Sequence, residues 1–326
     1  MNSSSLSRLF KSFQELTIAV IGDVMLDKYI FGKVSRISPE APVPIIDVSS
    51  QSYRLGGAAN VAINIHALGA KAMLIGVIGK DDEAQLLKQE LESSGLTGEF
   101  LVTDEARPTT CKTRVIAQNH HIVRIDSEER KGISQKVETL ILTHLKENSK
   151  GLHAIILEDY NKGVLTPSLI TKVITFAKKN DIPIAVDPKH DNFFAYQGVT
   201  VFKPNLKETS DALGIKFSNT DENIAKACKL LQAKTKAKAI VLTRSEKGVT
   251  VFEKSPIHIP TMALEVADVS GAGDTVIGVL STGLAAGMPI LQATRMANIA
   301  AGIVCAEVGA VAVDKEKLYN DCLKHL

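Results

Sequence analysis

The stretch DVSGAGDTVIG, residues Asp268–Gly278, places three small residues directly before an aspartate at the start of an apolar run. Backbone N–H groups at a helix start have no intrahelical partner, and the positive end of the helix dipole lies behind them. Small residues let an anion approach these groups closely. Gly271, Ala272 and Gly273 are therefore candidates for an anion hole, and Asp274 is a candidate general base beside it.

Two common phosphate-binding loops do not fit this stretch. It is not a Walker A loop, because no Gly-Lys-Ser/Thr follows, and its GxGx4G spacing is not a dinucleotide-binding fingerprint. Glycines alone are equally consistent with a tight strand-to-helix turn in which Asp274 is a first-turn acid. A base beside an anion cradle, however, is what phosphorylation of an alcohol by ATP requires.

Composition excludes several classes of protein. The chain has 326 residues, 45% hydrophobic and 23% charged, with a net charge of +2, so nothing favours nucleic-acid or membrane binding. The N-terminal segment has no apolar core of signal-peptide length. The cysteines form neither a CxxC nor a Cys/His cluster, which predicts reduced thiols and a cytoplasmic location. They are Cys111, Cys228, Cys305 and Cys322.

Residues 275–294 carry no charge and are as long as a membrane span. Gly287 is typical of a helix end, and Pro289 of the first turn of the next helix. We therefore expect two buried helices here.

Short apolar strands alternate with amphipathic helices over most of the chain, which predicts an α/β fold with a mostly parallel sheet covered on both faces. Pro42 and Pro44 confine one early extended segment to a sheet edge. Together with a hairpin near residues 109–126, it predicts a small accessory sheet from about 28–48 and 98–126. We expect one domain over residues 1–326.

Polar residues follow several predicted strands. In open parallel sheets, ligands bind beyond the carboxyl ends of the strands. These strand-end residues therefore outline a predicted site, and they are Asp23, Asp159, Asp187, Asn205 and Thr243.

Three ordered motifs resemble the ribokinase-like (phosphofructokinase B) carbohydrate kinases. The first is the opening stretch, which resembles the family's C-terminal signature. The second is residues 56–79, with Gly56, Gly57, Asn60, Gly69 and Gly79 at the family spacing, and the third is the NxxE motif at residues 205–208. The resemblance implies a ribokinase-like fold with a β-sheet lid, ATP as donor and Mg²⁺, and it leaves monovalent-cation activation open.

Within the family, residues 22–48, 159–165, 187–189 and 243–248 resemble the kinases of D-glycero-β-D-manno-heptose 7-phosphate. This implies ATP-dependent phosphorylation of the anomeric hydroxyl to the 1,7-bisphosphate, in ADP-heptose and lipopolysaccharide core biosynthesis. In many bacteria such a kinase is fused to a nucleotidyltransferase with an HxGH motif. That motif is absent here, so we expect a stand-alone kinase.

Three positions depart from the family pattern. Ser270 replaces a threonine, Glu158 stands where relatives tend to have a small residue, and Lys203 occupies an often neutral position. None of them is the proposed base.

The resemblance also assigns the nucleotide site. From spacing alone, Asn205 and Glu208 predict a helix cap. The resemblance instead favours an ATP-binding role, with Glu208 orienting a metal-bound water and with no direct protein ligand to Mg²⁺. The residues implied for ATP are Asn205, Leu206, Lys207, Glu208, Thr243, Ser245, Gly248 and Asn298.

The predicted sugar-phosphate site lies nearer the N-terminus. Carboxylates, an amide and a glycine suit sugar hydroxyls, and these are Asp23, Asp27, Gly57, Asn60 and Asp159. The 7-phosphate needs cations, although each candidate taken alone is more often a solvated surface charge. The candidates are Lys112, Arg114, Arg124, Lys162 and Lys189.

The resemblance also implies a role for the predicted accessory sheet. Family members use the strands of such a sheet as a lid that excludes water, and often as a dimer interface. We therefore expect a homodimer joined through the lids, with a sugar phosphate and ATP as its small-molecule partners. The alternatives are a kinase of the same family for ribose, fructose 1-phosphate or a nucleoside, and a non-catalytic sugar or nucleotide sensor. An NAD-dependent oxidoreductase is disfavoured, because no GxGxxG follows the first strand.

Overall fold

The computed structural model describes residues 2–118, 120–262, 266–307 and 309–326. Its centre is an eight-stranded sheet in the order β14-β13-β12-β11-β10-β9-β1-β4, parallel from β4 to β12 and antiparallel at β13 and β14. The prediction of a mostly parallel sheet is confirmed. The strands are β1 (Thr17–Gly22), β4 (Lys71–Ile75), β9 (Leu152–Glu158), β10 (Ile184–Asp187), β11 (Val201–Phe202), β12 (Ala239–Thr243), β13 (Val249–Phe252) and β14 (Pro256–Ile259).

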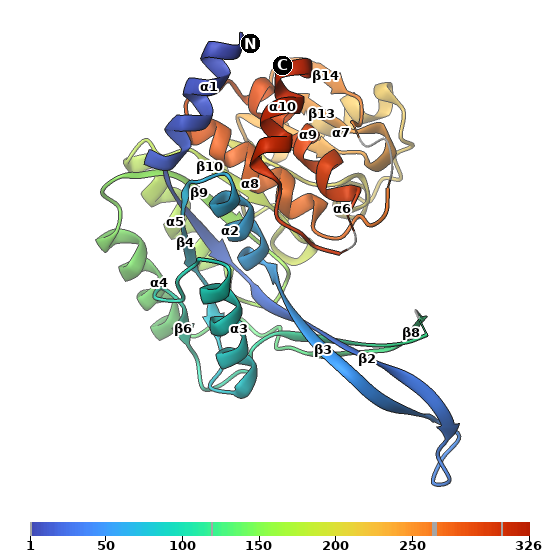
Figure 1. The fold of residues 1–326 in the computed structure, drawn as a ribbon. Coiled ribbons are helices and arrows are strands. Elements are labelled where there is room, and N and C mark those ends of the chain that lie inside the picture. Colours follow the sequence, from blue (N-terminus) through green and yellow to red (C-terminus); the bar gives the residue numbers. More distant parts are fainter. Residues whose placement is uncertain (1, 119, 263–265, 308) are drawn as a thin grey trace.

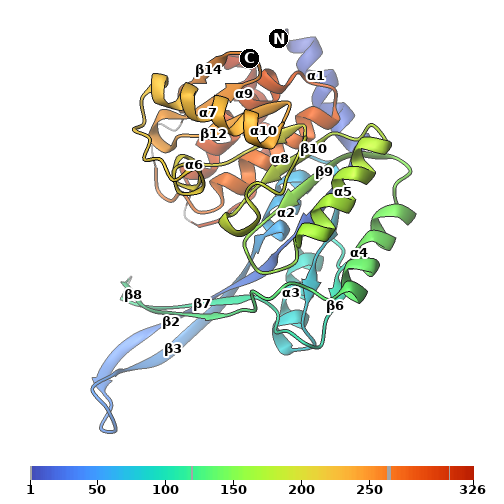
Figure 2. The same ribbon diagram turned by 180° about the vertical axis from the view of Figure 1, so that it is seen from behind.

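Helices cover both faces of this sheet (Figures 1 and 2). Alternate residues of β1 belong to two separate cores, since Ile18 and Val20 pack in one and Ala19 and Ile21 in the other. The first core includes α1 (Ser3–Ser12), α2 (Ala58–Ala67), α3 (Asp82–Ser93), α8 (Ala272–Ala285), α9 (Ile290–Cys305) and α10 (Lys315–His325). The second includes α4 (Gln135–Glu147), α5 (Pro167–Lys179) and α7 (Asp221–Thr235).

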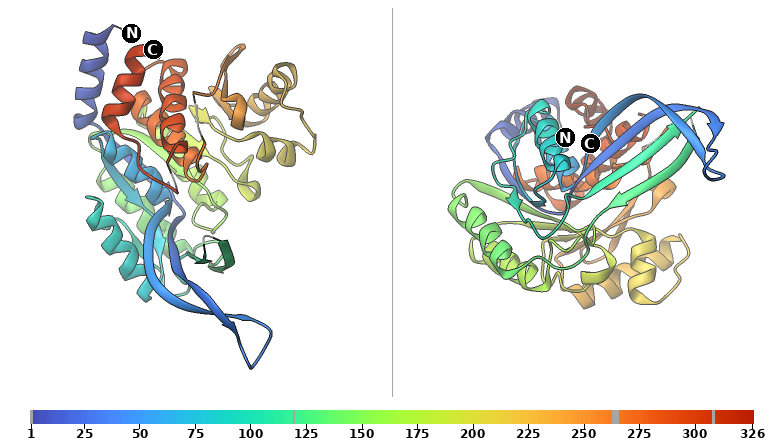
Figure 3. Two further views of the ribbon diagram at one scale, coloured as in Figure 1. Left: turned by 45° about the vertical axis from the view of Figure 1, so that its right-hand side comes forward. Right: turned by 90° about the horizontal axis from the view of Figure 1, so that it is seen from below.

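A second sheet, in the order β3-β2-β7-β8, extends from the body as an arm (Figure 1). Seen from below in Figure 3, its strands reach past the body. They are β2 (Val24–Ile37), β3 (Pro44–Gly57), β7 (Cys111–Ala117) and β8 (His120–Ser127). We call this four-stranded sheet the arm sheet.

The arm-sheet strands differ in extent from the expected 28–48 and 98–126. The first pair is longer because the inner ends of both strands continue into the core, where Val24–Leu26 and Leu55–Gly57 are buried. Residues 98–110 instead carry the two-residue strand β6 (Val102–Thr103), which pairs with β5 (Val77–Ile78). Pro44 begins an edge strand, as expected for a residue that cannot donate to the ladder.

The uncharged segment of residues 275–294 forms parts of α8 and α9, which meet at Gly287 with φ +81°. Within the described part of the chain, no helix combines the length and the hydropathy that crossing a bilayer would require. The four cysteines are buried and unpaired. Sequence patterns had not singled out α1 or α4.

Candidate active site

The anion-hole loop leads into α8, at the edge where the parallel strands end. Gly271 is the N-cap of α8 and has φ +78°, a conformation that costs glycine little, and no side chain caps this helix end. A Cβ on Gly271 would lie 2.8 Å from Nδ2 of Asn60. Gly273 has more room, because its nearest neighbours would be Lys203 Nζ at 3.7 Å and Asp187 Oδ2 at 3.8 Å.

Asp274, the proposed base, lies in the first turn of α8 and is 4% exposed. Its Oδ2 accepts a hydrogen bond from Nδ2 of Asn60 at 2.8 Å, and its Oδ1 accepts one from the hydroxyl of Tyr160 at 2.7 Å. Burial raises the pKa of Asp274 to about 6, although these two hydrogen bonds favour the charged form. The carboxylate is therefore held in a fixed orientation, and its pKa lies close to neutral pH, as a general base requires.

A buried group of charges lies beside Asp274. One carboxylate oxygen from each of Glu158, Asp187 and Asp274 lies within 4.8 Å of the other two. Nζ of Lys203 lies 2.8 Å from Oδ2 of Asp187. Burial opposes the charge of Lys203, yet Asp187 and Glu158 raise its pKa, so this lysine is a cation directly beneath the glycine loop.

Glu158 is the least compensated member of this group. Its side chain is fully buried, and neither carboxylate oxygen has a hydrogen-bond partner among the described residues. Burial, and then repulsion from Asp187 and Asp274, raise the pKa of Glu158 well above its ordinary value.

A cavity of about 700 Å³ opens in front of the loop. It is lined by Gly271, Ala272, Gly273 and Asp274, and by five of the residues predicted to bind ATP, which are Asn205, Thr243, Ser245, Gly248 and Asn298. Leu206, Lys207 and Glu208 are not among its lining residues. The side chain of Lys207 is 88% exposed and pairs with Asp211, and Leu206 packs against the second core.

Asn205 and Glu208 form a capping box at the start of α6 (Leu206–Leu213). The amide oxygen of Asn205 accepts from the backbone N–H of Glu208, and Oε2 of Glu208 accepts from that of Asn205. Oε1 of Glu208 also lies 2.6 Å from Nζ of Lys189. The helix cap predicted from the spacing is therefore confirmed. Glu208 also pairs with Lys189, which lines the cavity.

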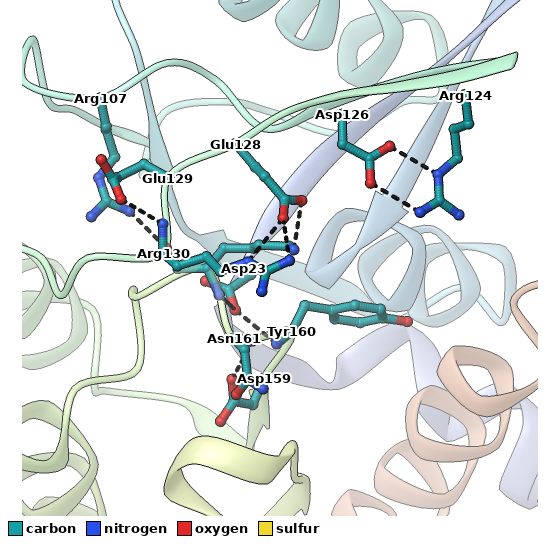
Figure 4. Close-up of polar contacts among 11 residues, drawn as sticks. Asp23, Arg107, Arg124, Asp126, Glu128, Glu129, Arg130, Asp159, Tyr160 and Asn161 are labelled. Carbon is teal, nitrogen blue, oxygen red and sulfur yellow. Dashed lines mark hydrogen bonds and ion pairs between the residues drawn. The ribbon is translucent and has the colours of Figure 1, made fainter.

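Two residues predicted to contact the sugar, Asp23 and Asp159, have carboxylates that already accept hydrogen bonds within the protein. Asp23 is 1% exposed, and its carboxylate accepts backbone N–H bonds from Tyr160, which Figure 4 shows, and from Lys162 and Val164. Asp159 accepts from the hydroxyl of Tyr196 at 2.6 Å and is 2% exposed. Both carboxylates face inward because the loop after β9 has backbone donors to satisfy.

The arm sheet and α2 carry three further residues predicted to contact the sugar. Asp27 pairs with Arg114 at 2.5 Å, across the β2–β7 ladder. Gly57 has φ +58°, and a Cβ there would clash with the carbonyl oxygen of Asp23. Asn60 lies inside α2 and not at its N-cap, so its side chain is free to reach Asp274.

Residues 15–317 match the pfkB family carbohydrate kinases. The chain belongs to the pfkB family. The family predicted from the three motifs is confirmed.

Two members described as "Bifunctional protein HldE" are among its relatives. The one from Pelobacter propionicus is 41% identical over 98% of this chain, and the one from Caulobacter vibrioides is 42% identical over 96%. The chain spans 66% and 65% of their respective lengths, so it corresponds to about two thirds of each.

Solved structures share the pfkB-family fold. Phosphofructokinase-2 from Escherichia coli in complex with potassium superposes with a TM-score of 0.75 at 18% identity, covering 94% of this chain and 99% of that one. Arabidopsis thaliana ribokinase complexed with ribose and ATP gives 0.74 at 18% identity, covering 95% and 98%. The ribokinase-like α/β fold predicted from sequence is confirmed.

Sequence reasoning did not select two residues that the structure brings to the site. Tyr160 bonds to Asp274, and Lys203 lies under the glycine loop. Tyr160 directly follows a predicted strand end, which is a signal that could have indicated it. In the sequence Lys203 is only an unusual charge near the NxxE motif, because its position beside Asp187 depends on the pairing of β10 with β11.

Proposed function

We propose that this chain transfers the γ-phosphoryl group of ATP to the anomeric hydroxyl of D-glycero-β-D-manno-heptose 7-phosphate. The observation that carries a kinase function is the buried, doubly hydrogen-bonded Asp274 at the start of α8, facing a cavity with two lysines. The choice of heptose rests on the likeness of residues 22–48 and 159–165 to heptose-phosphate kinases, and the HldE relatives are consistent with it. The 1,7-bisphosphate would feed ADP-heptose synthesis for lipopolysaccharide.

The chemistry follows from the positions of the side chains. Asp274 accepts the proton of the sugar hydroxyl while that oxygen bonds to the γ-phosphorus, and the bond from this phosphorus to the bridging oxygen of ADP breaks. Backbone N–H groups of residues 271–273 and the nearby Lys203 stabilise the charge on the transferring group. Asn60 and Tyr160 fix the orientation of the carboxylate.

Magnesium fits the oxygen donors at this site. Glu208 is held at both oxygens, by the backbone N–H of Asn205 and by Lys189, which itself lines the cavity. We assign it to a metal-bound water, because Mg²⁺ keeps several waters and rides on phosphates. When bound with ATP, the ion would neutralise phosphate charge.

We also propose that the arm sheet is a lid over the sugar, which limits ATP hydrolysis by excluding water. The inner end of β3 leads directly into α2, whose Asn60 donates to Asp274, so the arm sheet joins the body next to the proposed base. Dimerisation through the same sheet is part of this proposal.

An ATP-consumption assay tests the function. It compares heptose 7-phosphate with hexose phosphates, fructose 1-phosphate, ribose, nucleosides and free sugars. We expect the highest kcat/KM with heptose 7-phosphate, and a loss of about 10²- to 10⁴-fold in the variant Asp274→Asn. An Asp274→Asn variant that folds and keeps near-normal rates would contradict the role of Asp274, and preference for another acceptor would contradict the heptose assignment.

A further inference from the structure

Lys112 occupies the middle of a row of charges on the arm sheet. Its neighbours in register are Asp27 on β2 and Asp126 on β8. Because side chains alternate across a strand, these three residues share one face of the sheet. Two aspartates flanking a lysine would ordinarily neutralise it.

Each of the two aspartates forms an ion pair with an arginine that lies two residues away from this row along its strand. Arg114 pairs with Asp27 at 2.5 Å. Arg124 binds Asp126 through two bonds, of 2.9 and 3.0 Å, which Figure 4 shows. Among the ion pairs formed by the described residues, none includes Lys112.

Lys112 is nevertheless partly buried. Burial lowers its pKa, and the positive charge of Lys162 lowers it further. A cation in such a setting has lost hydration without gaining an ion pair, so an anion bound there would supply the missing interaction.

Lys162 is a second, fixed cation next to Lys112. Its Nζ lies 2.5 Å from Glu128, its backbone N–H donates to Asp23, and its carbonyl accepts from Arg107. Glu128 also pairs with Arg130 (Figure 4). The loop that carries Lys162 is therefore held from several sides in the structure.

The side chain of Tyr160 lies close to both Lys112 and the proposed base. Nζ of Lys112 lies 5.9 Å from the ring centroid, and the hydroxyl of the same tyrosine donates to Asp274. Lys112 and Asp274 are thus separated by about one aromatic side chain. An acceptor with its reacting hydroxyl at Asp274 would direct its far end toward Lys112.

We propose that Lys112, assisted by Lys162, binds the phosphate monoester at the end of the acceptor remote from the reacting hydroxyl. Arg114 and Arg124 are positioning residues that occupy the two aspartates and leave Lys112 available. Nζ of Lys189 lies 5.1 Å from the centroid of the Tyr160 ring, but Lys189 is already paired with Glu208 at 2.6 Å, so we do not assign it to this site. The inference rests on the proposed function, since it assumes that the acceptor is a sugar phosphate.

The decisive variant is Lys112→Gln, assayed with heptose 7-phosphate and with the same heptose lacking its phosphate. Losing a hydrogen bond between charged groups predicts that kcat/KM for the phosphorylated sugar falls by about 10- to 100-fold, mainly through KM. Activity on the unphosphorylated sugar should fall far less than activity on heptose 7-phosphate, and Lys112→Arg should recover part of the loss. A Lys112→Gln enzyme that keeps the wild-type preference for the phosphorylated sugar overturns the proposal.

The matched control is Lys33→Gln, which removes a positive charge from an exposed position of β2 in the same sheet. It should leave both kinetic constants unchanged. Equal losses in the two variants would point to general electrostatic attraction and would overturn the assignment to Lys112.

Calorimetric titration of heptose 7-phosphate without ATP separates this inference from the proposed function. Weakened binding in Lys112→Gln alone supports the phosphate site even if no variant turns over this sugar, an outcome that would contradict only the function. Binding that is unchanged in Lys112→Gln, or absent in the wild type, overturns the site. Circular dichroism checks that each variant is folded.

Discussion

Asp274 has opposing influences on its charge. Its burial disfavours the ionised form, whereas Asn60 and Tyr160 donate hydrogen bonds that favour it. The balance raises the pKa to about 6 and leaves the carboxylate mostly ionised at neutral pH.

This balance predicts the acid limb of the pH–rate profile. A general base works only when deprotonated, so kcat/KM should fall as pH drops through about 6 and be fully retained above it. The measurement is the rate at saturating ATP over a range of pH. A flat profile down to pH 5 would show that Asp274 does not act as a base with this pKa.

The phosphate of a sugar phosphate also titrates near pH 6, so a control is needed. Tyr160→Phe removes a hydrogen bond that lowers the pKa of Asp274. Its acid limb should therefore move to higher pH, whereas a limb due to the substrate would stay in place.

Glu158 predicts a pH-dependent stability difference. Its pKa is raised by folding, so its favourable contribution is present at low pH and is lost as pH rises through the raised value. Glu158→Gln cannot ionise, and its melting temperature relative to wild type should increase between pH 5 and pH 8. The exposed Glu92→Gln is the control and should show no such trend. A constant difference across this range would argue against a buried, uncompensated charge.

Single residues were predictable from sequence where local spacing sets their place. The glycine loop and Asp274 are adjacent in the chain, so their juxtaposition needed no tertiary information. Asp23 and Asp159 were placed at the correct sheet edge, but the direction of each carboxylate depends on backbone donors of a loop that sequence does not show. The contact of Tyr160 with Asp274 joins residues 114 positions apart.

At the scale of elements, two glycines at the start of α8 allow the effect of backbone geometry to be measured separately from the effect of anion binding. Gly273→Ala should fold normally, because the new Cβ would make only ordinary contacts, at 3.7 Å or more. The methyl group would nevertheless stand where phosphate approaches the backbone, and we expect kcat/KM for ATP to fall by about 10²-fold. Steady-state kinetics and a thermal unfolding curve check this.

Gly271→Ala provides the contrast. It should lose stability as well as activity, because its φ of +78° and its approach to Asn60 disfavour a side chain. If Gly273→Ala kept wild-type kinetics, the loop would be a turn and not an anion hole.

Element types followed from apolar periodicity, which identified the strands and helices that frame the large sheet. The lengths of these elements could not be predicted as well from apolar periodicity. β2 and β3 are each 14 residues long, because pairing between them continues from the buried core into solvent. Sequence shows only the apolar part of such a ribbon clearly, since pairing can be sustained by polar residues as well.

On the scale of the whole molecule, the arm sheet has two unlike faces. One carries the charged row around Lys112. On β8, Val123 and Ile125 alternate with Arg124 and Asp126, so they lie on the other face, and they are 47% and 56% exposed. Exposed apolar side chains on a projecting sheet are typical of an interface.

We therefore expect a homodimer at micromolar concentration by light scattering. The double variant Val123→Asp, Ile125→Asp should be monomeric with an unchanged circular dichroism spectrum, because charges on this face would oppose its burial. Wild-type chain that scatters as a monomer, or a double variant that remains a dimer, would contradict association through this face.

Tyr160 touches the base with its hydroxyl and has Lys112 near its ring. A rigid aromatic side chain between two binding points fixes their separation, and therefore the length of a molecule that can occupy both. A sugar one carbon shorter could satisfy either end but would reach both less well, so selection by length would be built into the loop that follows β9.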